Sequence, residues 1–207
     1  MAATNSRWFE MRKTKIWIWI WIVIALVAFA AASLMDTWAF HHLQKPNVYD
    51  QDWGRALRSV GYWPLWMLLS LALWLVDRKR GLGSRRAAFL AGSITAAGIL
   101  GEILKLIVRR ERPGTHDGLY GFRAFADHPF SSRNFGMPSS HAVIAFSGAA
   151  ALSVLFPEAT VVWYALAIGC GVTRVLSGAH FVSDVVAGAA IGIGVSLVIA
   201  RRWSVRP

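Results

Sequence analysis

A stretch near the end of the chain, from Thr173 to Asp184, contains an arginine, a histidine and an aspartate within otherwise apolar sequence. His180 and Asp184 are four residues apart, so on a helix their side chains would share one face. Ionisable groups at membrane depth are energetically costly, and those that remain usually have a function. We therefore regard this stretch as the first candidate for a chemical site.

Two further polar clusters lie at the ends of apolar runs. The first begins at Lys105, where an apolar run ends, and closes with Arg112 and a proline. The second is Ser139-Ser140-His141, which follows a proline at the start of another apolar run. If the runs are membrane helices that alternate in direction, both clusters reach the same membrane face as the Thr173–Asp184 stretch.

Together the three clusters supply the groups that bind a phosphate. Lys105, Arg112 and Arg174 would provide three cations, and the guanidinium fork of arginine matches the spacing of phosphate oxygens. The hydroxyls of Ser139 and Ser140, with the free N–H groups at a helix start, would add neutral donors. This set predicts a site for a phosphoryl group.

The remaining polar side chains are suited to transferring that group. His180 could attack phosphorus through its neutral imidazole, while Asp184 takes the other ring N–H and stabilises the developing charge. His141 would protonate the departing oxygen as a general acid. Water activated by the same histidine would then release phosphate from a phosphohistidine. Phosphoryl transfer depends mainly on positioning and charge stabilisation, which these residues would supply without a metal.

The composition is that of a membrane protein. Hydrophobic residues make up 56% of the 207, and the eleven tryptophans favour a membrane–water interface. The net charge of +11 falls in clusters between apolar runs, so we exclude nucleic acid as a partner. Cys170 is the only cysteine, which excludes a disulfide framework and a cysteine metal site, and His41 and His42 have no evident third ligand.

Six apolar runs predict an all-α polytopic membrane protein with six transmembrane helices, in one membrane-embedded domain over residues 1–207. The runs cover about residues 16–35, 60–76, 87–107, 139–156, 160–176 and 180–200. The first alternates bulky residues like a buried strand and contains small residues like a signal peptide, but its length favours a retained helix. The last contains Gly188 and Gly192, a spacing that permits close helix packing.

Six helices would place both termini on one side of the membrane. That side would carry 12 of the 22 lysines and arginines, in the basic N-terminus 1–15, the hairpin 77–86 and the tail 201–207. By the positive-inside rule we expect it to be cytoplasmic. The protein would then lie in the plasma (inner) membrane, with its site at the outer ends of helices three to six, facing the external or periplasmic side.

The long polar segment 108–137 would be an external loop that acts as a lid or selects the substrate. Four of its arginines could meet acidic headgroups: Arg109, Arg110, Arg123 and Arg133. Glu102 lies one turn before Lys105 and could either pair with that lysine or line a polar helix contact.

The clusters resemble the three signature motifs of the type 2 phosphatidic acid phosphatase family, relatives of the vanadium haloperoxidases. The first motif, Lys-x6-Arg-Pro, is met by Lys105–Pro113. The second, Pro-Ser-Gly-His, is met by Pro138–His141 with Ser140 in place of glycine. The third, Ser-Arg-x5-His-x3-Asp, is met by Thr173–Asp184 with threonine in place of serine. The haloperoxidases are soluble, so the resemblance is to the membrane branch.

The resemblance implies a metal-independent lipid phosphatase without a cofactor, whose partner is a phosphorylated lipid in the bilayer. The implied substrates are a polyprenyl diphosphate, phosphatidylglycerol phosphate, phosphatidate or a lipid A phosphate. The implied catalytic residues are His180, His141 and Asp184, and the implied phosphate ligands are Lys105, Arg112, Ser139, Ser140 and Arg174.

Two other functions remain open at this stage. The protein could be a phosphotransferase that passes the phosphoryl group from His180 to a lipid or sugar acceptor. It could also be a lipid-binding or transport protein on the same fold, although binding alone does not require two histidines and an aspartate. The residues leave the lipid, the acceptor and the oligomeric state open.

Overall fold

The computed structural model describes residues 2–203, with side chains placed from residue 16 onward. The cations expected in residues 1–15, and the end of the basic tail at 204–207, lie outside the described side chains. Within residues 2–203 the regular structure is helical, and β-pairing is limited to two isolated bridges, between Arg110 and Phe122 and between Glu111 and Phe135. The predicted all-α class is confirmed.

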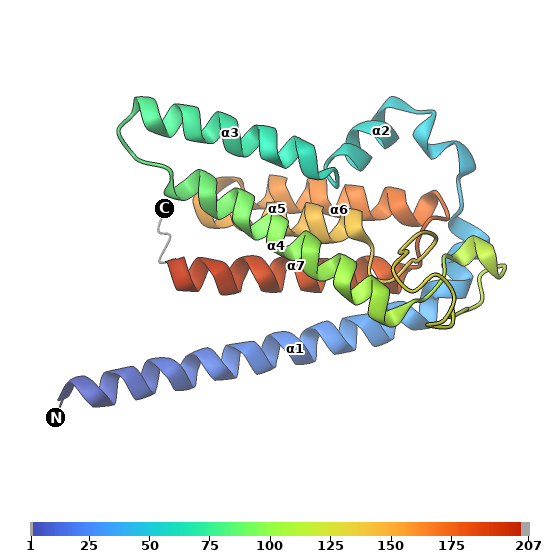
Figure 1. Cartoon of the computed structure of the whole chain (residues 1–207), viewed down its shortest axis with the longest axis horizontal. Helices are drawn as coiled ribbons and strands as arrows, with labels where there is room; N and C mark the ends of the chain where they lie inside the picture. Colours follow the sequence, from blue (N-terminus) through green and yellow to red (C-terminus); the bar gives the residue numbers. More distant parts are fainter. Residues whose placement is uncertain (1, 204–207) are drawn as a thin grey trace.

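Seven α-helices follow one another in the described residues (Figure 1). They are α1 (Ala2–Leu43), α2 (Asp52–Ser59), α3 (Trp63–Lys79), α4 (Arg85–Val108), α5 (Ser140–Leu155), α6 (Thr160–Leu176) and α7 (Val182–Trp203). Three short 3-10 turns lie at Pro46–Tyr49, Pro113–Thr115 and Pro157–Ala159.

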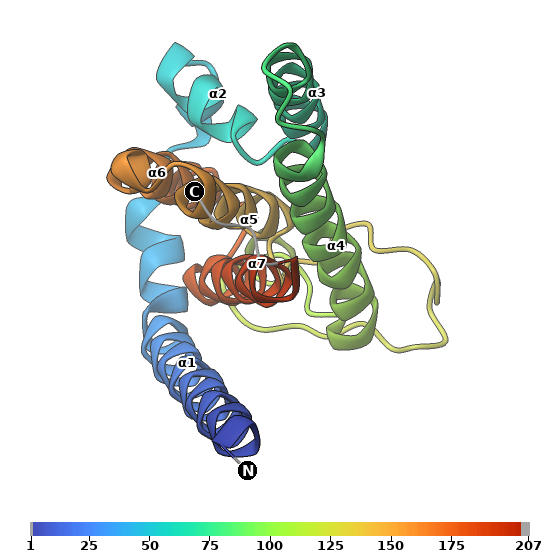
Figure 2. The same ribbon diagram turned by 90° about the vertical axis from the view of Figure 1, so that its left-hand side faces the viewer.

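Helix α5 is the centre of the bundle. Figure 2 shows it between α4, α6 and α7, and most of its side chains are buried. Helix α7 packs closely on it because Gly188 has no side chain: a Cβ there would lie 2.8 Å from the carbonyl oxygen of Ser139. The hydroxyls of Ser147 and Ser196 are 2.8 Å apart across the same contact. Gly188 therefore provides the close helix approach that the sequence permits.

Within the described residues, four helices are long and apolar enough to cross a membrane, and the bent pair of α2 and α3, which meet at 65°, would make five. The four are Ile16–Leu43, Arg85–Val108, Pro157–Leu176 and Val182–Trp203. These spans make the chain a multi-pass membrane protein. Helix α5 is apolar but has only 16 residues, which is shorter than the usual length of a span.

Helix bounds differ from the sequence prediction at two places that matter for the site. Helix α1 continues past the predicted end near residue 35 to Leu43, so Asp36 is helical and buried. Helix α7 begins at Val182, so His180 lies in the turn before the helix and does not share a helix face with Asp184. The cause is Gly178, whose positive φ of 67° ends α6 and starts a turn that the chain must complete before α7.

The ends of the helices gather the polar segments at one end of the bundle. In Figure 1 the start of α1 and the end of α7 lie at the left, while the end of α4, the starts of α5 and α7 and the segment 109–139 lie at the right. The three polar clusters thus meet at one end of the bundle.

Candidate active site

The three clusters are joined by direct contacts. The backbone N–H of Ser139 donates to the carbonyl oxygen of Asp184 at 3.0 Å, which links the second cluster to the third. The ammonium of Lys105 donates to the hydroxyl of Ser140, which links the first to the second. The structure therefore brings residues of α4, α5 and α7 into one site.

The contacts of His180 show which of its two ring nitrogens carries the proton. It is 3% exposed, and its Nδ1 lies 2.9 Å from the carbonyl oxygen of Gly136. Because a carbonyl can only accept, Nδ1 must carry the proton and Nε2 the lone pair. The sequence prediction gave this ring proton to Asp184, but the nearer Asp184 oxygen is 3.6 Å from Nδ1. The Gly136 carbonyl is the direct acceptor, and Asp184 affects the ring through its charge from a slightly longer distance.

Burial keeps the His180 ring neutral. Loss of water contact lowers the pKa of His180 to about 4, although the negative charge of Asp184 acts in the opposite direction. The positive charges of Arg174 and Lys105 add to the lowering of this pKa. A neutral ring with a free Nε2 lone pair is the form that a nucleophile requires.

Asp184 is completely buried and fully bonded. One of its oxygens accepts from the guanidinium of Arg110, with Nε at 3.2 Å, and the other accepts the backbone N–H of Phe181 at 2.9 Å. Gly136 fits beside it because a Cβ there would lie 2.8 Å from Asp184 Oδ2. The prediction that Arg110 meets acidic headgroups is therefore wrong, since its partner is inside the protein.

Arg109 also binds inside the protein. Its side chain is 1% exposed and donates to the carbonyl oxygens of Arg123 at 3.2 Å and Ala124 at 2.9 Å. Arg123 in turn donates to Glu111 at 2.7 Å. These bonds shape the 108–137 loop, and of the four arginines proposed for headgroups only Arg133 is exposed and without an ion-pair partner among the described residues.

Lys105 is buried at the end of α4 and bonded on two sides. It lies 3.3 Å from Glu102, which settles the alternative for that carboxylate in favour of pairing. Ser140, which stands where the family motif has glycine, accepts from Lys105 and donates to Glu102 at 2.5 Å. The departure from the motif thus adds a hydroxyl that holds the lysine in place.

Three buried polar atoms in the site have no partner within the described part of the chain. They are Nε of Arg112, Nε of Arg174 and the hydroxyl oxygen of Ser139, one from each cluster. A buried polar atom left unpaired costs about 1–3 kcal/mol, so such atoms are rare outside functional sites. Two guanidinium donors and a hydroxyl are suited to phosphate oxygens.

Two positioning groups have no signal in the sequence. Tyr49 accepts from Arg174 Nη1 at 2.7 Å and donates to the carbonyl oxygen of Thr173 at 3.1 Å, so it orients the arginine. The Gly136 carbonyl orients His180. A tyrosine outside any motif and a backbone oxygen could not have been selected from the sequence.

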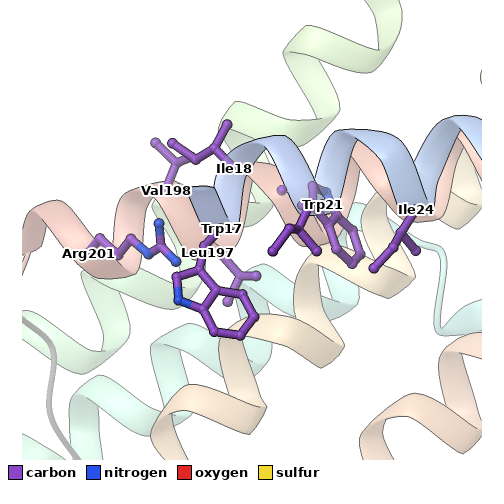
Figure 3. A pocket seen from close by; sticks show the side chains of 9 residues that line it. Trp17, Ile18, Trp21, Ile24, Leu197, Val198 and Arg201 are labelled. Carbon is purple, nitrogen blue, oxygen red and sulfur yellow. The ribbon is translucent and has the colours of Figure 1, made fainter. Parts of the chain in front are cut away.

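An apolar groove of about 550 Å³ leads to the site between α3, α4 and α5. His141 and Ser140 line its inner end, and Gly98, Ile99 and Ile103 line its wall on α4. The groove thus connects an apolar surface with the polar cluster. A separate apolar cavity, between the start of α1 and the end of α7, contains none of the predicted site residues (Figure 3).

The comparisons with known proteins cover the same region. The sequence profile of the PAP2 superfamily matches residues 86–206, which include all three clusters. The lipid A 1-phosphatase of Rhizobium johnstonii is 39% identical over 115 residues, 55% of this chain and 46% of that protein. That of Rhizobium etli is 40% identical over 116 residues, 55% of this chain and 48% of that protein. The chain spans about half the length of these curated relatives, and no solved structure matches significantly.

Proposed function

Because this chain belongs to the PAP2 superfamily, the type 2 phosphatidic acid phosphatase family that its motifs resemble, we propose that it is an integral membrane lipid phosphatase. It hydrolyses a phosphomonoester or pyrophosphate of a lipid. The observation that carries this proposal is the set of unpaired donors of Arg112, Arg174 and Ser139, in a site where His180 presents a free Nε2.

In the first step, the Nε2 lone pair of His180 bonds to phosphorus, and the bond from phosphorus to the lipid oxygen breaks. His141 gives its proton to that oxygen, so that the lipid leaves as an alcohol or as the lower phosphate. The bond from Nδ1 to Gly136 holds the ring, and the Asp184 carboxylate offsets the positive charge that the imidazole gains.

In the second step, water attacks phosphorus of the phosphohistidine. His141, now neutral, takes a proton from the water, and the bond between Nε2 of His180 and phosphorus breaks. Inorganic phosphate leaves, and both histidines return to their starting forms. The cations Lys105, Arg112 and Arg174 stabilise the charge on the equatorial oxygens in both steps.

The groove on α4 supports a lipid as the substrate. Its wall is apolar and its inner end is lined by His141, so a hydrocarbon chain can lie along α4 while the phosphate reaches the cations. The named relatives are lipid A 1-phosphatases, and we place the phosphate of a lipid A type molecule first among the four candidate lipids.

We further propose six membrane crossings, in which α2 with α3 forms one and the short α5 forms another. Helix α5 is enclosed by its neighbours, so its 16 residues need not match the full thickness of the lipid. An even number of crossings would put both termini on the same side of the membrane. The positive-inside rule predicts that this side is cytoplasmic, so that the site would lie at the external or periplasmic face of the plasma membrane.

The test is a phosphate-release assay with the purified protein on the four candidate lipids. We expect release from at least one of them without an added acceptor, and loss of more than 99% of it in His180→Gln. The matched control is His116→Gln, in a histidine that contacts Glu111 in the loop and should keep at least half of the activity.

Two outcomes would contradict the proposal. Phosphate transfer only in the presence of a lipid or sugar acceptor would indicate the phosphotransferase. Binding of a lipid phosphate without release under any of these conditions would indicate a binding or transport protein.

A further inference from the structure

Asp36, on the membrane-spanning helix α1, is bonded to the start of α7. It is 1% exposed, and one of its oxygens accepts the backbone N–H of Ser183 at 2.9 Å while the other accepts the Ser183 hydroxyl. Ser183 is the second residue of α7, where backbone N–H groups lack partners within the helix. A carboxylate from α1 therefore caps α7 and interacts with the positive end of its dipole.

Arg110 connects this cap to Asp184. Its Nη2 donates to the Ser183 hydroxyl at 2.7 Å and to Asp184, and its Nε lies 3.2 Å from Asp184. The rings of Tyr120 and Phe181 lie against the guanidinium, with centroids at 4.9 Å and 5.1 Å. The two rings cover the guanidinium and hydrogen bonds hold its N–H groups, so the position of the arginine is fixed.

Tyr120 joins the same network from the loop. Its hydroxyl donates to Asp36 at 2.7 Å, so that the 108–137 loop, α1 and α7 all meet at this carboxylate. Among the described residues, the network contains one bonded cation, Arg110, and two carboxylates, Asp36 and Asp184. Asp184 is the carboxylate that lies 3.6 Å from His180, whose ring becomes positive when it bonds phosphorus.

We propose that Asp36 and Arg110 are positioning residues of the active site, which make α1 part of the catalytic apparatus. They hold Asp184 and the first turn of α7 in register with His180. The Asp184 carboxylate that they hold in place offsets the positive charge of the phosphohistidine. This inference rests on the proposed phosphatase function and adds a helix that contains none of the three motifs.

The experiment compares each positioning residue with a buried residue of the same type outside the network. Asp36→Asn is paired with Asp77→Asn, because Asp77 is equally buried on α3 and bonded to Arg86 at 3.2 Å. Arg110→Lys is paired with Arg109→Lys, because Arg109 binds only loop carbonyls. For each variant, kcat, KM, the thermal midpoint and the affinity for orthovanadate are measured.

We expect kcat to fall about 100-fold in Arg110→Lys and about tenfold in Asp36→Asn, with KM changed by less than about threefold. The two control variants should keep kcat within about threefold, even where their thermal midpoint falls. Equal losses of kcat in test and control variants would overturn the proposal, because they would reflect lost stability alone. So would an Asp36→Asn protein with the kcat of the wild type.

The pH profile supplies a readout of charge. The groups facing His180 are Asp184 from α7, Arg174 from α6, Lys105 from α4 and His141 from α5. Arg110→Gln removes the cation that balances Asp184, so the acidic limb of kcat/KM should move to higher pH. Asp36→Asn removes one negative charge from the network, so the limb should move to lower pH. Shifts in the same direction would overturn the charge argument.

Orthovanadate separates this inference from the proposed function, because it mimics the pentacoordinate phosphoryl group and needs no turnover. We expect Arg110→Lys and Asp36→Asn to bind it about tenfold more weakly than the wild type, and the controls to bind it normally. Equal binding by all variants would overturn the positioning role. A wild type that binds orthovanadate but releases phosphate from none of the lipids would overturn the phosphatase alone.

Discussion

The ring of His180 is oriented by a backbone oxygen. The Gly136 carbonyl fixes which nitrogen carries the proton, and the absence of a side chain at Gly136 lets Asp184 approach from the same side. A carbonyl cannot take the proton away, so this contact favours one defined tautomer of the ring. In the proposed mechanism Asp184 compensates charge, a role that needs proximity more than a direct hydrogen bond.

This burial predicts an unusually acidic lower limit for activity. The pKa of His180 is lowered to about 4 by burial, whereas an exposed histidine titrates at about 6.5. The neutral nucleophile should therefore persist as the pH falls, and kcat/KM should be bell-shaped with its acidic limb near pH 4. The measurement is kcat/KM for phosphate release between pH 3.5 and 9, with samples returned to pH 7 to exclude irreversible loss.

The lowered pKa of His180 also determines how the stability of the folded protein changes with pH. The unfolded chain binds a proton at this histidine below about pH 6.5, while the folded protein does so only near pH 4. The stabilisation of the folded protein that follows from the neutral His180 is therefore fully present above about pH 6.5 and is lost as the pH falls toward 4.

For the activity profile, an acidic limb of kcat/KM near pH 6.5, or a flat profile, would contradict the burial of His180.

In the proposed mechanism, cationic side chains take the role that metal ions have in many phosphoryl-transfer enzymes. Lys105, Arg112 and Arg174 together can neutralise a phosphate dianion. In the described residues no group of three or more histidine, cysteine, aspartate or glutamate side chains is placed to hold a metal. We expect EDTA to leave phosphate release within about twofold of the untreated protein. A loss that added Mg²⁺ or Zn²⁺ restores would show that the cations are insufficient.

At the scale of the elements, α4 serves two purposes. Its last turns place Lys105 and Glu102 in the site, while the residues before them form the wall of the groove. The bend between α2 and α3 closes the groove near its inner end, because a Cβ on Gly61 would lie 2.6 Å from the Cβ of His141. In the proposed function, the same helix would position a phosphate ligand and guide the hydrocarbon chain.

A bulky side chain in the groove should affect long lipids alone. Ile103→Trp places a larger side chain in the wall and so narrows the groove. Ile107→Trp enlarges an exposed residue of α4 that does not line the groove. We expect Ile103→Trp to raise KM for a long-chain lipid phosphate about tenfold and to leave p-nitrophenyl phosphate unaffected. Ile107→Trp should change neither. Equal KM values for the lipid in all three proteins would place the hydrocarbon chain elsewhere.

At the scale of the whole molecule, the sequence predicted the parts that have a periodic or spaced signature. The apolar runs predicted helices within a few residues for α4 and α6, because a membrane span needs a continuous apolar length. The spacings within the three motifs selected Lys105, Arg112 and His180 as candidates, because residues that contact one phosphate must stand at fixed positions, and their roles stay predictions.

The parts that could not be predicted depend on contacts between distant segments. Asp36 and Ser183 are 147 residues apart, and Asp36 read as the first polar residue after a span. Arg110 read as a loop cation because nothing local shows that its partner is Asp184. In both cases the charged side chain is buried and bonded inside the protein. This burial results from the packing of distant helices, which the local sequence does not show.

The orientation of the molecule in the membrane is the last prediction, and it follows from the distribution of charge. The segments 1–15, 77–86 and 201–207, which six crossings would place on one side, contain 12 of the 22 lysines and arginines, and the positive-inside rule predicts that this side is cytoplasmic. In a Cys170→Ala background, Leu82→Cys marks the 77–86 hairpin and Phe130→Cys the 108–137 loop, at side chains that are 55% and 92% exposed. In intact cells a membrane-impermeant maleimide should label Phe130→Cys alone, and after permeabilisation it should label both. Labelling of Leu82→Cys alone in intact cells would place the site in the cytoplasm, where it would act on lipids of the inner leaflet.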